Sequence, residues 1–304
     1  QPNGDRFDIL NEAGSQSMQV IQSTQQIWYI SGNEKMKLNS SGYLGIGTTS
    51  PAYKLDVWGD VAINKFSGYY QDGNRILYAS STNFSTLAGI GAGAALLSDG
   101  LYNTAIGYQA LNVATSTDYN TAIGYQALKT IIQGATDNVA IGYLAGSTLT
   151  TSYGNVAIGS NALKSATTGV YNTAVGYQAL NMTNTGHNNA AFGTNALVNN
   201  TTGYYNMGIG PYALNTNTEG FQNAAVGFQG LYSNTTGNNN VAIGHASLYS
   251  AQTASGNVGI GFYALVFATA GNNTAVGYSA LAGASNTGTG NIALGYQAGN
   301  NITS

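Results

Sequence analysis

A repeat of about 17 residues fills most of this chain and limits its fold more than any other feature. The unit reads Asn-x-(Ala/Gly)-(Ile/Val/Phe/Leu)-Gly, and eight of the eleven spacings between its asparagines are 17 residues. A degenerate first copy begins at Leu87 and makes thirteen copies. A period of this length is typical of a solenoid, in which each unit buries its apolar side only by stacking on the next. The units begin at Asn103, Asn120, Asn138, Asn155, Asn172, Asn189, Asn206, Asn223, Asn240, Asn257, Asn273 and Asn291.

The length and content of the unit favour strands and turns. Seventeen residues are too few for two helices and a turn, and frequent Gly, Asn and Thr disfavour a helix. One coil with two short strands and two turns fits this length. Parallel strands lie about 4.8 Å apart, so the sequence predicts an all-β fold, a parallel β-solenoid or β-roll roughly 60 Å long. We expect about 13 coils of 17 residues.

Two apolar columns are predicted to form the core. With the asparagine as position 1, position 4 is always apolar and position 9 is leucine in ten copies. Stacked coils would place each side chain on its equivalent in the next coil and bury both columns continuously. The predicted core residues are Ile106, Ile123, Ile141, Ile158, Val175, Ile209, Val226, Ile243 and Ile260, with Leu111, Leu128, Leu163, Leu180 and Leu214.

Positions 3 and 5 hold only Ala or Gly, and two interpretations remain open for them. Side chains alternate along a strand, so both positions lie on the face opposite position 4. Residues this small let another backbone approach closely. The columns either form a contact between chains around a shared axis, in an intertwined or packed homotrimer, or simply fit a narrow coil interior.

The asparagine at position 1 is predicted to form an in-register amide ladder along the solenoid. Asparagine also tolerates left-handed turn geometry, so its expected role is structural. The ladder residues are Asn103, Asn120, Asn138, Asn155, Asn172, Asn189, Asn206, Asn223, Asn240 and Asn257.

Position 6 is often aromatic. The rings could stack along the solenoid and stabilise neighbouring coils. Alternatively, they form an exposed stripe that contacts sugar rings or another protein. Interruptions at Ser160, Thr194, Pro211 and His245 favour the structural interpretation. The candidate surface contacts are Tyr108, Tyr125, Tyr143, Tyr177, Tyr278 and Tyr296.

The region before the repeats has a different composition. Six of the eight basic residues precede Thr86, so we expect a β-rich shaft or attachment region at 1–86 and the solenoid domain at 87–304. Strand-like runs occupy 7–10, 18–21 and 27–30. Asp72-Gly73 lies between two further apolar runs and predicts a hairpin.

Several functional classes are not expected. The chain has no cysteine, only 6% charged residues and a net charge of -3, so thiolate sites and nucleic-acid binding are disfavoured. His187 and His245 lie in different columns and neither has a neighbouring carboxylate. We therefore expect no catalytic, cofactor or metal site and no enzyme activity. No apolar run approaches the roughly 18 residues of a membrane span.

Two resemblances follow from particular residues. The units Asn103–Leu111 and Asn155–Gly159 resemble the head repeats of trimeric autotransporter adhesins, which implies a left-handed parallel β-roll in a head built from three chains. The segments Lys35–Pro51 and Lys54–Gly59 are similar to the shafts of phage tail fibres and to large surface proteins of some bacteria. The resemblances imply a trimeric extracellular fibre on a virion or a cell surface.

The functional expectation is a non-enzymatic structural fibre that attaches to a host cell or surface. Its expected partners are other copies of itself and a glycan or protein receptor. The alternative is a subunit that polymerises end to end into an extracellular filament, because the end of a solenoid exposes strand edges. An ice-binding surface ranks last, because position 2 is threonine only at Thr104, Thr121, Thr173 and Thr274.

Overall fold

The structure is a computed structural model that describes residues 8–10, 16–19, 25–30, 33–59, 69–71, 74–79, 84–96, 99–283 and 287–300. The described residues are strands, turns and irregular segments, without a helix. The chain forms two compact units, residues 1–64 and 65–304, which are described separately.

The first unit contains a six-stranded sheet in the order β1 to β6. Neighbours pair antiparallel from β1 to β5, and β5 pairs parallel with β6. The strands predicted at 7–10, 18–21 and 27–30 correspond to β1, β2 and β3, although Phe7, Val20 and Ile21 lie outside the described residues. The strands are β1 (Asp8–Leu10), β2 (Gln16–Gln19), β3 (Gln26–Ile30), β4 (Asn33–Leu38), β5 (Leu44–Ile46) and β6 (Leu55–Val57).

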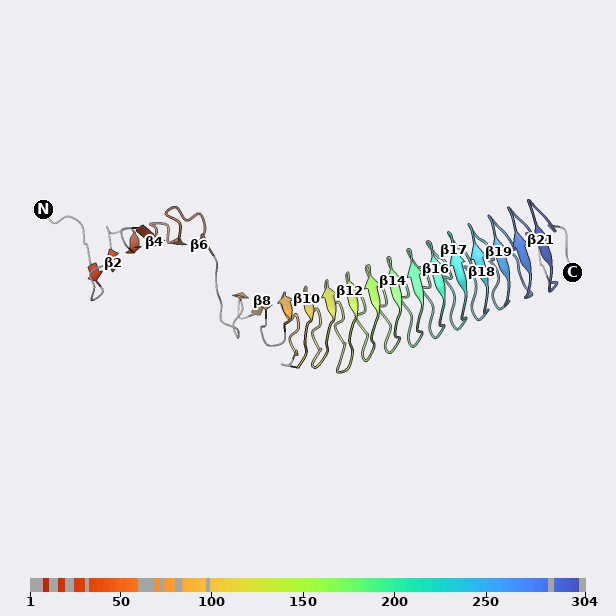
Figure 1. Ribbon diagram of the computed structural model, residues 1–304, viewed down its shortest axis with the longest axis horizontal. Helices are drawn as coiled ribbons and strands as arrows, with labels where there is room; N and C mark the ends of the chain where they lie inside the picture. The colour runs from red at the N-terminus through yellow and green to blue at the C-terminus, as the bar shows by residue number, and fades with distance from the viewer. Residues whose placement is uncertain are drawn as a thin grey trace. The chain divides into compact units, whose positions relative to one another are not determined.

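The second unit is built on one fifteen-stranded sheet, drawn as the regular stack of coils in Figure 1. The hairpin of β7 (Tyr69–Gln71) and β8 (Asn74–Ala79) pairs antiparallel with β9 (Thr86–Ala88). Asp72 and Gly73 themselves lie outside the described residues. This pairing joins the hairpin to the solenoid, so the compact units divide at 64/65 rather than near residue 86.

The predicted parallel β-solenoid is confirmed. Strands β9 to β21 are all parallel and in register, and these thirteen strands bound about twelve complete coils. The strands after β9 are β10 (Thr104–Ile106), β11 (Thr121–Ile123), β12 (Val139–Ile141), β13 (Val156–Ile158), β14 (Thr173–Val175), β15 (Ala190–Phe192), β16 (Met207–Ile209), β17 (Ala224–Val226), β18 (Val241–Ile243), β19 (Val258–Ile260), β20 (Thr274–Val276) and β21 (Ile292–Leu294).

Each complete coil holds one strand of three residues, not the two strands expected. The second side of the coil is a chain of turns, because positions 7 and 9 adopt left-handed backbone geometry. In the first regular coil, Gln109 and Leu111 both have φ of 53°. Two left-handed residues separated by one residue cannot continue an extended strand. They turn the leucine of position 9 into the interior, where Leu111 is fully buried.

The core is built mainly from the position 9 leucines and the small residues of positions 3 and 8, and position 4 does not contribute to it. Ala105 is fully buried, whereas 40% of the Ile106 surface is exposed. At Gly208, which occupies position 3, a Cβ would lie 3.4 Å from Cδ1 of Leu197. The leucine column therefore leaves room for a methyl group across the coil but not for an isoleucine.

The prediction that position 4 forms part of the core is wrong, because the space opposite the position 9 leucines accepts only a small side chain. Its nine residues project from the opposite face of the strand and are half-buried or exposed. The predicted leucines, in contrast, are fully buried. The misplaced residues are Ile106, Ile123, Ile141, Ile158, Val175, Ile209, Val226, Ile243 and Ile260.

The glycine column at position 5 is required by contacts between coils of the same chain. Gly159 has φ of +131°, a backbone geometry that disfavours side chains. A Cβ at Gly159 would also lie 2.5 Å from the carbonyl oxygen of Gly176 in the next coil. The small-residue columns thus serve the interior and the stacking of a single solenoid, which decides between the two interpretations left open by the sequence.

Candidate interaction surface

The outward-facing side chains of the solenoid sheet form a continuous apolar surface. In β10 to β21, positions 2 and 4 point away from the interior, and we call these residues the outer strip. Position 4 contributes Ile, Val, Phe or Leu, and position 2 contributes mostly Thr, Val or Ala. The strip contains no charged side chain. Such a surface is open to a partner with a complementary apolar face.

The position 4 side chains of the outer strip are exposed to a large extent for apolar side chains that stack in a column. Ile141, Phe192 and Ile243 are 37%, 41% and 41% exposed although neighbouring coils cover them on both sides. Twelve strands spaced about 4.8 Å apart and roughly 10 Å of strip width give an area of roughly 600 Å². Patches of this size on soluble proteins commonly mark interaction sites.

The predicted asparagine ladder lies inside the solenoid. Oδ1 of Asn103 accepts hydrogen bonds from the backbone N–H and from Nδ2 of Asn120, at 3.0 and 3.3 Å. Nδ2 of Asn120 also donates to the carbonyl of Ala135 at 3.1 Å. The side chains of Asn103 and Asn120 are at most 1% exposed. The other predicted ladder residues are buried to the same extent: Asn138, Asn155, Asn172, Asn189, Asn206, Asn223, Asn240 and Asn257.

The ladder therefore closes the corner of each coil and offers no surface to a ligand. Each Oδ1 holds the backbone of the next coil, as in the 3.0 Å bond from the N–H of Asn189 to Asn172. Nδ2 of the other ladder residues holds the turn that precedes the next asparagine, as in the 2.9 Å bond from Asn189 to the carbonyl of Gly203, whereas Nδ2 of Asn257 is buried without a partner among the described residues.

The position 6 tyrosines both stack and remain exposed. Tyr108, Tyr125 and Tyr143 form one stack with ring centroids 5.4 and 5.3 Å apart. Tyr278 and Tyr296 form another pair at 5.3 Å. These five rings and Tyr177 are between 42% and 73% exposed. The stacking of the rings stabilises neighbouring coils. Position 6 lies two residues after position 4 of the outer strip, and its rings remain exposed to solvent.

Both histidines lie in aromatic stacks that the sequence reading missed. His187 stacks on Tyr204 at 5.2 Å, and Tyr204 stacks on Phe221 at 4.9 Å. His245 lies between Phe228 and Phe262, at 5.2 and 4.8 Å. The 17-residue spacing could have revealed both stacks, because His187, Tyr204 and Phe221 lie 17 residues apart and therefore occupy the same column. In the described part of the chain, no three His, Asp or Glu residues gather into a potential metal site.

Comparisons with known proteins return no relatives. The chain matches no protein family, and no curated protein or solved structure matches it significantly. Among the described residues, no helix has the length and hydrophobicity needed to cross a membrane.

Proposed function

We propose that this protein is a non-enzymatic, extracellular structural fibre that acts as a homotrimer in attachment to a host cell or surface. The outer strip is the observation that carries this proposal. It is apolar, uncharged and parallel to the solenoid axis over twelve strands. The resemblance of the repeats to adhesin heads, and of residues 35–59 to fibre shafts, supports the same function.

The size of the outer strip fits packing between copies of the chain. Stable interfaces bury about 800 Å² per partner. The strip supplies roughly 600 Å², which a trimer divides between two neighbours, so the exposed position 6 side chains that follow it in sequence contribute to the interface as well. Three chains arranged around one axis would each turn the strip inward, so every copy would contact two neighbours through the same columns. A closed ring of this kind leaves no apolar strip in contact with water.

A pair of lysine substitutions tests the assembly. Ile209 is 38% exposed in the single chain, so Ile209→Lys leaves the coil folded but places a charge in the proposed interface. Thr202→Lys adds the same charge at an exposed turn outside the strip. Light scattering is expected to give a mass of three chains for the unaltered protein and for Thr202→Lys. Ile209→Lys is expected to give a monomer. A monomeric unaltered protein would contradict the proposal.

The alternative function is a subunit of an end-to-end filament. Strand β21 pairs with β20 on one side, and no described strand pairs with its other side. Ile292 and Leu294 in β21 are 82% and 78% exposed. If this edge docks on another subunit, Ile292→Asp will abolish filaments in electron micrographs while single particles still fold. Discrete three-chain particles in the unaltered protein would instead exclude continuous polymerisation.

A further inference from the structure

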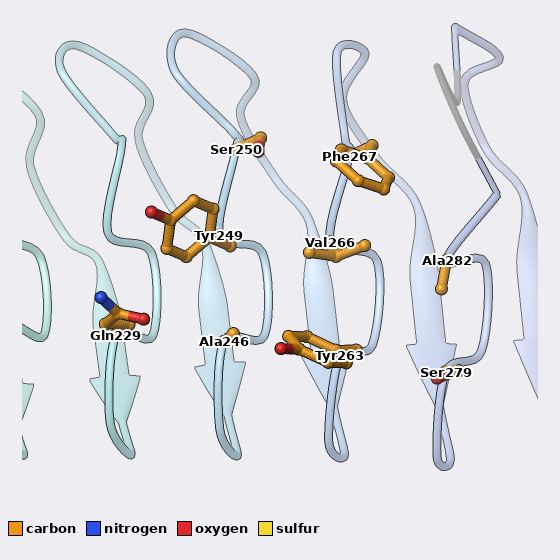
Figure 2. A pocket seen from close by; sticks show the side chains of 9 residues that line it. All are labelled: Gln229, Ala246, Tyr249, Ser250, Tyr263, Val266, Phe267, Ser279 and Ala282. Carbon is orange, nitrogen blue, oxygen red and sulfur yellow. The ribbon is translucent and has the colours of Figure 1, made fainter.

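A hollow of about 530 Å³ lies on the solenoid away from the strands of the outer strip. It spans four consecutive coils and is lined by side chains from positions 7, 10 and 11, on the segments that follow β17 to β20. Its volume falls within the roughly 300–1,000 Å³ typical of ligand sites. Its lining includes Gln229, Tyr249, Ser250, Tyr263, Phe267 and Ser279 (Figure 2).

The hollow exists because the repeat is broken here. Position 7 holds a long or branched polar side chain in most coils, such as Gln109, Gln126 and Gln178, but it holds Ala246 between Gln229 and Tyr263. The missing side chain opens the space. The next coil, from Asn257 to Asn273, is also one residue shorter than the usual period. Neither change is needed to build a solenoid, since the other coils stack without them.

Aromatic rings form the walls, and two of them are held in place by other rings. Tyr249 stacks on Tyr232 with centroids 5.0 Å apart and planes 3° from parallel. Tyr263 meets Phe262 at 4.3 Å and His245 at 5.5 Å, edge to face in both cases. A site whose rings are already fixed loses little conformational entropy when a ligand binds.

The third ring, Phe267, completes an apolar wall that is open to solvent. Phe267 is 45% exposed and Tyr263 is 39% exposed. Figure 2 shows Val266 between these two rings, and Tyr249 on the preceding coil. An apolar ligand face could therefore lie against several rings at once.

Polar groups at the edges of the hollow are available for a ligand. In the described part of the chain, the side chains of Gln229, Ser250 and Ser279 make no hydrogen bond within the protein. The amide of glutamine donates and accepts, and so does each serine hydroxyl. No charged residue lines the hollow. A charged ligand would lose its hydration there without a compensating partner.

From this combination we infer that the hollow binds a neutral saccharide. A sugar ring has an apolar face of C–H groups and a rim of hydroxyls. The face suits the rings of Tyr249, Tyr263 and Phe267, and the hydroxyls suit the amide and serine groups around them. This inference rests on the proposed attachment function. It specifies that the receptor recognised by the protein is a neutral glycan. The site is separate from the strip proposed for assembly.

A substitution that restores the repeat tests the inference. Ala246→Gln fills the hollow with the side chain that position 7 carries elsewhere, and Gln109 and Gln126 have left-handed φ values of 53° that match the 49° of Ala246. Asn195→Gln makes a comparable change at the same position three coils earlier. The probes are lactose, maltose, cellobiose and N,N′-diacetylchitobiose, examined by saturation-transfer NMR and titration calorimetry. Light scattering is run on the same samples.

We expect at least one disaccharide to bind the unaltered protein and Asn195→Gln equally. Ala246→Gln is expected to weaken that binding at least tenfold, and Phe267→Ala is expected to weaken it as well. The mass of all four proteins should be the same. Binding by none of the four probes, or equal binding by Ala246→Gln, overturns the saccharide site while leaving the assembly intact. A change of mass in Ala246→Gln also overturns it, because the hollow would then seat another copy of the chain.

Discussion

Asn217 donates a hydrogen bond from Nδ2 to the carbonyl of Gly220, three residues later in the same turn, at 3.0 Å. A Cβ on Gly220 would overlap Oδ1 of Asn217. The same arrangement joins Asn200 to Gly203 and Asn234 to Gly237. A buried asparagine at position 12 therefore requires a glycine at position 15.

These asparagines also form a second ladder inside the solenoid. Nδ2 of Asn217 donates to Oδ1 of Asn200 at 2.7 Å, and Nδ2 of Asn234 donates to Oδ1 of Asn217 at 2.6 Å. All three side chains are fully buried. Where position 12 is alanine, as at Ala251, position 15 can be alanine too, as at Ala254.

The first prediction concerns the glycine of this pair. Gly220→Ala is expected to lower the free energy of unfolding by about 2–4 kcal/mol, because the new methyl group displaces a buried, hydrogen-bonded amide. Denaturant titration followed by circular dichroism measures the loss. The double variant Asn217→Ala/Gly220→Ala removes the overlap with Oδ1 of Asn217 and should recover part of that stability. The overlap of the new methyl group with the carbonyl oxygen of Gly237 in the next coil, at 2.6 Å, remains. Additive losses from the two substitutions would show that the pair is not coupled.

The second prediction extends the ladder by one coil. Oδ1 of Asn234 is buried without a hydrogen-bond partner, because the next coil offers Ala251. The double variant Ala251→Asn/Ala254→Gly supplies an amide donor and the glycine that it requires. It should be more stable than Ala251→Asn alone by about 1 kcal/mol, the usual net value of one hydrogen bond. The oxygen of the new amide faces the buried Ala268 and becomes the unpaired group in place of Oδ1 of Asn234.

The single variant Ala251→Asn is the matched control for this gain. Its amide would meet the Cβ of Ala254, so it should be neutral or destabilising in the same denaturant titration. Greater stability in the single variant than in the double variant would contradict the proposed dependence on glycine.

The period of the repeat was sufficient to predict a parallel solenoid, but not which side of the strand faces inward. Alternation places Ala105 and Ile106 on opposite faces, and either face could in principle be buried. The choice depends on Leu111, whose left-handed backbone turns it inward and leaves space for only a methyl group opposite. Leucine rarely adopts this geometry, so local sequence preferences do not reveal it.

The hollow at Ala246 illustrates a second limit of the sequence. Positions 7, 10 and 11 hold residues of different kinds in different copies, and no single copy marks them as a group. Only the stacking of four coils brings Gln229, Tyr249, Phe267 and Ser279 together. In contrast, the asparagine ladder follows from the sequence directly, since identical residues one period apart must meet in an in-register stack.

The third prediction concerns that first ladder. Oδ1 of Asn120 accepts from both the backbone N–H and Nδ2 of Asn138, each at 3.1 Å, in a buried corner. Asn120→Ala leaves both donors without this acceptor, and each lost partner costs about 1–3 kcal/mol. Calorimetry is expected to show a lower melting temperature. Thr202→Ala, at an exposed turn, is the control and should leave the melting temperature nearly unchanged.

The fourth prediction concerns the response of the proposed assembly to salt. Raising the salt concentration from 0.1 to 1 M shortens the screening length from about 10 Å to about 3 Å. An interface held by ion pairs would weaken over this range, but strands β10 to β21 carry no charged side chain. The mass measured by light scattering should therefore stay constant from 0.02 to 1 M sodium chloride. Dissociation as the salt concentration rises would mean that charged residues outside the outer strip hold the chains together, and the strip would then not be the interface.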